Sequence, residues 1–307
     1  MKLPSRVAIV EVGPRDGLQN IHHFVSTDDK VRLIDALSET GVATVEVTSF
    51  VHPKLVPQMA DAEAVLRRIQ RRPGVQFMGL VPNEKGAARA LDSGVDVVNV
   101  VVSASESHNQ ENVRMSVAES LERISRIADL AREAGKPMRA DISTSFGCPF
   151  EGRVAPERVI AVARGLRDIG AERVTLCDTT GMANPLQVEQ LVHRCIDELR
   201  GIELGVHFHN TRGAGPANVL AALQAGADIV AGSIGGLGGC PFAPGATGNV
   251  CTEDMVHMLE EMGVATGVDL RKLIRAAKLA QEILGRELPG QVMKAGPVYD
   301  LHRRESC

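Results

Sequence analysis

Aromatic side chains are scarce in this 307-residue sequence, which contains no tryptophan, one tyrosine and seven phenylalanines. So few rings argue against a platform on which nucleic-acid bases stack. The 34 Lys and Arg residues against 38 Asp and Glu residues give a formal net charge of −4, so no overall positive field attracts nucleic acid or an anionic membrane. Membrane-spanning hydrophobic runs are also missing. We therefore expect neither nucleic acid nor a membrane among the partners of this protein.

Targeting and redox signals are missing as well. Arg6, Glu11 and Arg15 interrupt the apolar N-terminal stretch, so it has no signal-peptide core, and we expect a cytoplasmic protein. Six cysteines occur, and the closest two, Cys240 and Cys251, are eleven positions apart. This spacing excludes CxxC redox chemistry and a cysteine-based zinc site, and predicts reduced thiols.

The commonest nucleotide-binding motifs, G-x-G-x-x-G after the first strand and G-x-x-x-x-G-K-[ST], are absent. What the sequence has is an alternation of short β-branched runs with longer amphipathic segments. Eight units of this kind in about 230 residues fit a (β/α)8 TIM barrel of class α/β better than an open doubly wound sheet of five or six strands. The predicted strands are Val7–Gly13, Thr44–Phe50, Val75–Val81, Val95–Ser103, Met138–Thr144, Arg173–Thr179, Leu204–Asn210 and Ala227–Ile234.

Helix signals and domain limits follow the same alternation. Asp28 and Asp29 precede an apolar-periodic segment, and Gly41 follows as a C-terminal stop, which is typical of a barrel helix. After Gly263 the pattern predicts one or two further helices packed on the barrel, with no linker before them. We therefore expect a single domain over residues 1–307, with a catalytic core at 1–263 and a C-terminal helical extension at 264–307.

Polar residues gather where the predicted strands end. In barrel enzymes the active site lies at the carboxyl ends of the strands, so these residues should meet at one mouth of the barrel. They are Arg15 and Asp16 after the first strand, Glu46, Thr48 and Ser49 in the second, Asp178 in the sixth, His207, His209 and Asn210 in the seventh, and Gly235–Cys240 with Asn249 after the eighth.

The His-Phe-His sequence is the clearest sign of a metal site. His207 and His209 are two positions apart on a strand, so both imidazoles point to the same face. Asp16 adds a carboxylate from across the barrel, and Asn249 adds a carbonyl oxygen. This set suits Mg²⁺ or Mn²⁺, although two histidines and a carboxylate also fit non-haem Fe(II). The alternative is a pair of interior histidines that are satisfied by hydrogen bonds.

Arg15 fits two roles that can coexist. An ion pair with Glu46 would tie the first two strands together, while the guanidinium would stabilise a developing enolate oxygen. Asp178 either caps the strand end at Thr179 or Thr180, or relays protons beside Asp16.

Cys240 follows the glycine-rich segment Gly235–Gly239. It is either a small apolar filler in a flexible turn or a thiol that a mobile loop delivers to the substrate, with a pKa lowered by a nearby cation.

Taken together, these motifs resemble those of the 3-hydroxy-3-methylglutaryl-CoA lyases. That family belongs to the metal-dependent barrel enzymes that share an Arg-Asp pair, a Glu on the second strand and an HxH on the seventh. The resemblance runs from about Val10 to about Gly263, and its Gly-Leu-Gln-Asn and Gly-Gly-Cys-Pro motifs separate the lyases from isopropylmalate and homocitrate synthases. The stretches that carry it are Val12–Asn20, Glu46–Phe50, Pro53–Met59, Gly147–Gly152 and Gly238–Ala243.

The resemblance implies cleavage of 3-hydroxy-3-methylglutaryl-CoA, or a close 3-hydroxyacyl-CoA, to acetyl-CoA and a 3-oxo acid, an activity of leucine degradation. It assigns the divalent cation, Mg²⁺ or Mn²⁺, to Asp16, His207, His209 and Asn249. Arg15 would stabilise the enolate, Cys240 would transfer the proton, and Glu46 and Asp178 would support them. The substrate contacts implied are Arg15, Gln19, Ser49 and Arg212.

Two positions depart from the family pattern. Arg212 stands where the family often has Tyr, and His22 stands where it often has Lys. Arg212 would bring a cation beside the metal, and the loss of the Lys would remove a contact to the CoA phosphates. Either change can redirect the enzyme to another 3-hydroxyacyl-CoA.

Two other functions remain open from the sequence. One is a related barrel enzyme, either an aldolase acting on a 4-hydroxy-2-oxo acid or a Claisen-type synthase, against which Cys240 argues. The other is a non-catalytic barrel that binds a ligand or serves as a scaffold. In each case we expect a homo-oligomer, a dimer or a tetramer.

Overall fold

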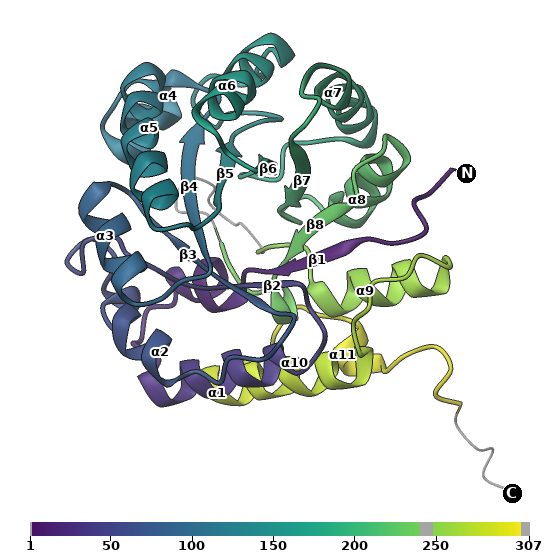
Figure 1. Ribbon diagram of the computed structural model, residues 1–307. Helices are drawn as coiled ribbons and strands as arrows, with labels where there is room; N and C mark the ends of the chain where they lie inside the picture. Colours follow the sequence, from purple (N-terminus) through teal and green to yellow (C-terminus); the bar gives the residue numbers. More distant parts are fainter. Residues whose placement is uncertain (1, 240–247, 302–307) are drawn as a thin grey trace, which may run out of the picture.

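The computed structural model describes residues 2–239 and 248–301. Its eight parallel strands pair in chain order, and β1 also pairs with β8, so the sheet closes into a barrel with the helices outside (Figure 1). The predicted (β/α)8 barrel is therefore confirmed. The strands are β1 (Ala8–Glu11), β2 (Thr44–Ser49), β3 (Gln76–Leu80), β4 (Val97–Ser103), β5 (Met138–Ser143), β6 (Arg173–Asp178), β7 (Glu203–Phe208) and β8 (Ile229–Gly232).

The barrel helices alternate with these strands, and short helical turns occupy some of the loops. The helices are α1 (Thr27–Ser38), α2 (Ala62–Arg68), α3 (Glu84–Asp92), α4 (Glu106–Val113), α5 (Val117–Glu133), α6 (Pro156–Ile169), α7 (Pro185–Glu198), α8 (Gly215–Gln224), α9 (Thr252–Glu261), α10 (Leu270–Leu284) and α11 (Val292–Ala295). The turns are η1 (Gly13–Gly17), η2 (Pro57–Met59) and η3 (Ile234–Gly236).

The predicted strands overlap the observed ones, but most are too long at their ends. The first was expected to reach Gly13, whereas β1 stops at Glu11 because the chain turns at once into η1. There the N–H groups of Asp16 and Gly17 both bond to the carbonyl of Val12. This turn, rather than a longer strand, places Arg15 and Asp16 at the mouth.

Helix α1 begins slightly before the predicted signal. Its N-cap is Ser26, whose hydroxyl accepts the N–H of Asp29, so Asp28 and Asp29 lie within the first turn. Acidic side chains there interact favourably with the helix dipole.

Helices α10 and α11 form the predicted C-terminal extension. Figure 1 shows α10 lying alongside α1, and its buried Leu273 and Ala277 belong to the same core as Leu33 and Leu37 of α1. The division at residue 263 stays a prediction.

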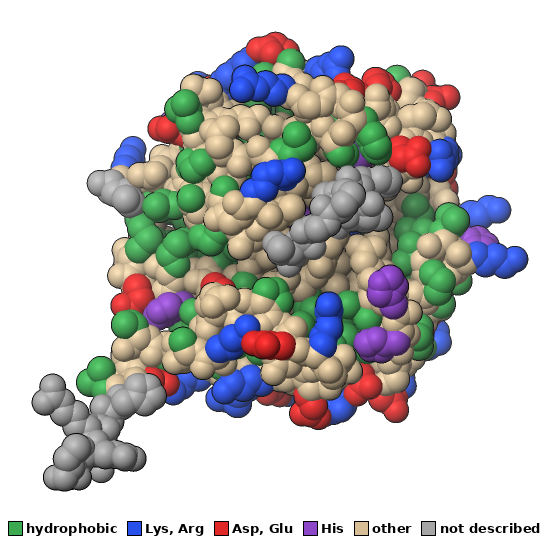
Figure 2. Space-filling view, turned by 180° about the vertical axis from the view of Figure 1, so that it is seen from behind, with side chains coloured by type: hydrophobic (Ala, Val, Ile, Leu, Met, Phe, Trp, Pro, Cys, Tyr) green, Lys and Arg blue, Asp and Glu red, His purple; other side chains and the backbone are tan. Residues whose placement is uncertain are grey.

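The surface carries both signs of charge. On the face in Figure 2, Lys and Arg side chains are interspersed with Asp and Glu side chains. Within residues 2–239 and 248–301, no helix is both long and apolar enough to cross a membrane.

Candidate active site

Three of the predicted metal ligands meet at the barrel mouth. Asp16 comes from η1, and His207 and His209 come from the end of β7, with their rings 5.2 Å apart between centroids. Each residue offers one ligand atom, and these atoms all lie within 4.8 Å of one another. Alternation along the strand puts both histidines on the inner face, as the spacing predicted.

Asn249 joins this group from the segment before α9. Its amide Nδ2 donates to Asp16 Oδ2 at 2.7 Å and to the carbonyl of Leu237 at 2.9 Å. Because both amide hydrogens are used, the orientation of the side chain is fixed. Its Oδ1 is then left buried, with no hydrogen-bond partner among the described residues.

The donor atoms fit a divalent cation. The unpaired Oδ1 of Asn249 is costly unless a ligand satisfies it, and His209 Nε2 lies 3.9 Å from Asp16 Oδ2, so this nitrogen faces the same carboxylate. Burial lowers the pKa of His207 to about 3 and that of His209 below its ordinary value, so both imidazoles are neutral and able to coordinate. Burial works to raise the pKa of Asp16, but Arg15 and the two histidines hold it at about 2.

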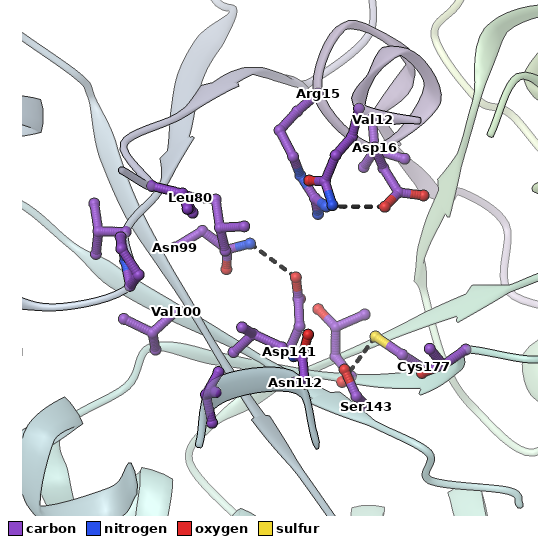
Figure 3. Close-up of a pocket in the computed structure, with 18 of the residues that line it drawn as sticks. Val12, Arg15, Asp16, Leu80, Asn99, Val100, Asn112, Asp141, Ser143 and Cys177 are labelled. Atoms are coloured by element: carbon purple, nitrogen blue, oxygen red, sulfur yellow. Dashed lines mark hydrogen bonds and ion pairs between the residues drawn. The ribbon is translucent and has the colours of Figure 1, made fainter. Parts of the chain in front are cut away.

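Arg15 connects the metal ligands to a second acidic group. Its Nε donates to Glu46 Oε2 at 2.6 Å, so the expected pair with Glu46 is present. Its Nη1 donates to Asp16 Oδ1 at 2.9 Å (Figure 3). Burial opposes the charge, yet Glu46 and Asp16 keep the pKa of Arg15 above its ordinary value. Two carboxylates thus fix the guanidinium at the mouth, while its Nη2 makes no hydrogen bond to the described residues.

Glu46 was named from the sequence, but its neighbours Asn99 and Asp141 were missed. Asn99 on β4 donates a hydrogen bond from its Nδ2 to Glu46 Oε1 at 2.9 Å. The same nitrogen donates to Asp141 Oδ2 of β5 at 2.8 Å (Figure 3). Burial raises the pKa of Glu46 to about 7 and also raises that of Asp141. We call Glu46, Asn99 and Asp141 the acidic arc. Its only signal in the sequence is polar residues interrupting apolar strands, which is a weak signal.

A cavity of about 610 Å³ opens at this mouth and continues into the barrel. It is lined by Arg15, Asp16, Gln19, His207 and His209, so Gln19 lies where a substrate contact was expected. Ser49 does not line it. That side chain is fully buried, and its hydroxyl accepts the N–H of Val51 at 3.3 Å.

Asp178 and Arg212 also lie away from the cavity lining. Successive side chains along β6 point to opposite faces, so Cys177 and Thr179 line the cavity while Asp178 points outward. Asp178 accepts the N–H groups of Met182 and Ala183, not those of Thr179 or Thr180, so it holds the loop before α7. Burial raises the pKa of Asp178 to about 6, against these hydrogen bonds and the charge of Arg212.

The side chain of Arg212 bonds the same loop. Its Nη1 donates to the carbonyls of Thr180 and Gly181, both at 2.9 Å. The expectation that Arg212 reaches the cation is therefore not met in this structure, because the guanidinium turns to backbone carbonyls instead.

Two buried carboxylates anchor the glycine-rich segment. Glu11 accepts the N–H groups of Gly13 at 2.7 Å and Ile234 at 2.8 Å, and Glu253 accepts that of Gly235 at 3.0 Å. Burial raises the pKa of Glu11 to about 8 and that of Glu253 to about 7. Sequence reasoning missed both acids. Cys240, at the end of this segment, lies outside the described residues.

Comparison with known proteins gives a consistent match. A family model described as HMGL-like matches residues 6–280. The hydroxymethylglutaryl-CoA lyase YngG of Bacillus subtilis is 45% identical over 291 residues, which cover 95% of this chain and 97% of that protein. The mitochondrial hydroxymethylglutaryl-CoA lyase of Rattus norvegicus is 44% identical over 293 residues, which cover 95% of this chain and 90% of that protein.

Solved structures of HMG-CoA lyases also match this chain. The crystal structure of the Bacillus subtilis HMG-CoA lyase matches with a TM-score of 0.94 at 44% identity, covering 96% of this chain and 99% of that chain. An HMG-CoA lyase from Acinetobacter baumannii, in complex with coenzyme A and 3-methylmalate, matches with a TM-score of 0.93 at 43% identity and covers 99% of both chains.

Proposed function

Because this chain belongs to the HMGL-like family, we propose that it is a divalent-cation-dependent carbon–carbon lyase that cleaves 3-hydroxy-3-methylglutaryl-CoA to acetyl-CoA and acetoacetate. The observation that carries the proposal is the group of Asp16, His207 and His209 beside Arg15, in a chain so similar to lyases along nearly its whole length. The aldolase, the synthase and the non-catalytic barrel have no comparable support.

The cation site would be formed by Asp16, His207, His209 and Asn249, and Mg²⁺ or Mn²⁺ suits these oxygen and nitrogen donors. When bound, the cation supplies a Lewis acid that lowers the pKa of the tertiary hydroxyl of the substrate. Asp16 and Asn249 hold each other through their hydrogen bond, so the ligands are positioned before the substrate enters.

The remaining chemistry falls to the side chains around this site. The hydroxyl gives up its proton to solvent and its oxygen becomes the ketone of acetoacetate. The C2–C3 bond breaks, and the electron pair of that bond moves to C2 as the enolate of acetyl-CoA. Arg15 is held by Glu46 and Asp16 and stabilises the enolate oxygen with its remaining N–H donors. We assign the protonation of C2 to Cys240, at the end of the segment that Glu11 and Glu253 anchor.

The test is an assay of the purified protein on 3-hydroxy-3-methylglutaryl-CoA with Mg²⁺ or Mn²⁺, in which acetyl-CoA and acetoacetate are identified by mass spectrometry. We expect equimolar products, and none after exhaustive chelation. A folded, cation-loaded protein that leaves this substrate intact contradicts the proposal. Parallel assays with a 4-hydroxy-2-oxo acid, and with acetyl-CoA plus a 2-oxo acid, test the aldolase and the synthase.

Two further properties belong to this proposal. We place the protein in the reducing cytoplasm, which the free and buried thiols of Cys148, Cys177, Cys195 and Cys251 support. We also propose a homo-oligomer, a dimer or a tetramer, supported by the exposed apolar side chains of Val298, Tyr299 and Leu301. Sedimentation measures the second property directly.

A further inference from the structure

The interior of this barrel holds a cavity that is lined in part by polar side chains, where such barrels are usually filled. Branched apolar side chains normally pack the lumen of a (β/α)8 barrel. Here the cavity passes below Arg15 and reaches Val10, Met78 and Ala231, and on the way it is lined by Asn99, Asp141 and Thr175. Figure 3 shows Asn99 and Asp141 meeting below Arg15. Part of the substrate can therefore extend into the barrel, past the cation site.

The amide of Asn99 has only one possible orientation. Its Nδ2 donates both of its hydrogens, to Glu46 Oε1 at 2.9 Å and to Asp141 Oδ2 at 2.8 Å, and these two bonds orient the amide. The other end of the amide, Oδ1, then faces elsewhere. Asn99 is 1% exposed and lines the cavity, and its Oδ1 has no hydrogen-bond partner among the described residues.

A buried acceptor without a donor is costly, at about 1–3 kcal/mol, so the group that fills this part of the cavity should donate a hydrogen bond. A methyl group cannot do so. A carboxylate cannot donate either, and Glu46 and Asp141 would repel it.

A cationic substituent is also disfavoured. Arg15 and a bound divalent cation together balance the three carboxylates Asp16, Glu46 and Asp141, and the buried Arg139 lines the same cavity, so no net negative charge is left for another cation to neutralise. The donor that remains is a neutral one, and a hydroxyl is the smallest such group that a short acyl substituent carries.

We propose that the enzyme prefers 3-hydroxyacyl-CoA substrates whose substituent at C3 carries a hydroxyl group, which donates to Asn99 Oδ1. This inference rests on the proposed lyase function and adds to it a class of substrate. For the 3-hydroxymethyl analogue the C2–C3 bond breaks as before, giving acetyl-CoA and 4-hydroxy-3-oxobutanoate. The tertiary hydroxyl loses one proton, C2 gains one, and nothing is oxidised or reduced.

The experiment compares 3-hydroxy-3-methylglutaryl-CoA with 3-hydroxy-3-(hydroxymethyl)glutaryl-CoA, which differ by one hydroxyl. A site built to accept a hydrogen bond discriminates strongly against an analogue without the donor. We expect the parent enzyme to show kcat/KM at least tenfold higher for the hydroxymethyl substrate. In Asn99→Leu, which keeps a similar volume without the acceptor, this ratio should fall to about one. In the control Met78→Leu, which reshapes the same cavity and keeps Asn99, the ratio should stay as in the parent.

Each outcome separates the two proposals. If the parent enzyme cleaves both substrates equally, or prefers the methyl substrate, the inference is overturned and the lyase function stands. If it cleaves neither substrate, the proposed function fails. If Asn99→Leu folds and keeps the parent ratio, another group selects the hydroxyl and the role of Asn99 is overturned. Should Asn99→Leu not fold, the ratio measured in the parent enzyme still decides the preference.

Discussion

The two sides of the barrel mouth differ in how far their polar atoms satisfy one another. On the cation side, His207 Nδ1, His209 Nδ1 and Asn249 Oδ1 are buried without hydrogen-bond partners among the described residues. On the other side, the carboxylates of Glu46 and Asp141 both accept hydrogen bonds from Asn99. Among the described residues the cation side therefore leaves three buried atoms without partners, whereas the acidic arc leaves one, Asn99 Oδ1, and Arg15 joins the two sides.

Loss of a ligand on the cation side should have the largest effect. In His207→Ala we expect kcat to fall on the order of 10³-fold, because the cation contributes several kcal/mol to the transition state and loses a nitrogen ligand that water replaces weakly. Calorimetric titration with Mn²⁺ should show weaker binding. The control is His193→Ala, an exposed histidine on α7, which should keep both properties. Unchanged Mn²⁺ affinity in His207→Ala contradicts the ligand assignment.

Loss of Cys240 should have the second largest effect on kcat. Loss of a proton-transfer group lowers kcat by about 10²–10⁴-fold, so we expect Cys240→Ala to lose turnover while Mn²⁺ binding and the melting temperature stay near those of the parent. Cys195→Ala in α7, away from the mouth, should retain its turnover. A near-normal rate in Cys240→Ala would return this residue to the role of an apolar filler.

Much of this comparison was visible in the sequence: the ligands on the cation side, and on the other side Glu46 with its ion pair to Arg15. His207, His209 and Asp16 were predicted because their residue types mark metal chemistry and strand alternation fixes their direction. Asn99 and Asp141 were missed because a polar residue within a strand does not show which partner it meets across the barrel. The hydrogen bonds of Arg212 were missed for a related reason, since loop carbonyls that attract a guanidinium leave no trace in the sequence.

The third test concerns Arg15, which contacts both sides of the barrel mouth. Arg15→Lys keeps the positive charge, but one ammonium cannot reproduce the rigid fork that reaches Asp16, Glu46 and the substrate together. We expect kcat to fall about 10²-fold, as for the loss of one fixed donor to a developing oxyanion, with Mn²⁺ affinity largely kept. Arg126→Lys on α5, an exposed site, serves as the control. If kcat is unchanged, the guanidinium does not stabilise the enolate.

Glu11, which anchors the glycine-rich segment, should have a smaller effect, and that effect concerns the free energy of unfolding. Burial raises the pKa of Glu11 from 4.5 to about 8, so the folded state retains a proton that the unfolded chain releases. The free energy of unfolding should therefore fall as the pH rises from about 4.5 through about 8.

Glu11→Gln removes this titration. Between pH 5.5 and pH 8, the melting temperature of this variant should fall less than that of the parent. The difference should be about 1–2 °C, the shift that about 1 kcal/mol produces in a 307-residue domain. Differential scanning calorimetry at the two pH values measures the difference. The exposed Glu122→Gln should follow the parent. Parallel curves for Glu11→Gln and the parent would show that Glu11 is not protonated in the folded state at pH 5.5.

The smallest effect should come from Arg212, which lies near the cation side but outside the cavity. Its two hydrogen bonds go to the carbonyls of Thr180 and Gly181, so it connects the loop after β7 to the loop after β6. Arg212→Tyr loses both bonds without altering the cavity lining. We therefore expect kcat/KM for the methyl and hydroxymethyl substrates to fall by the same factor, about threefold or less, with their ratio unchanged. In Arg212→Lys, which keeps one donor to these carbonyls, kcat/KM should lie between the values for Arg212→Tyr and for the parent. A contact to the substrate would instead shift the ratio by about tenfold, the effect of roughly 1.4 kcal/mol of differential binding. That result would mean that the guanidinium leaves its carbonyls when substrate binds, and selectivity would then belong to both sides of the mouth rather than to the acidic arc.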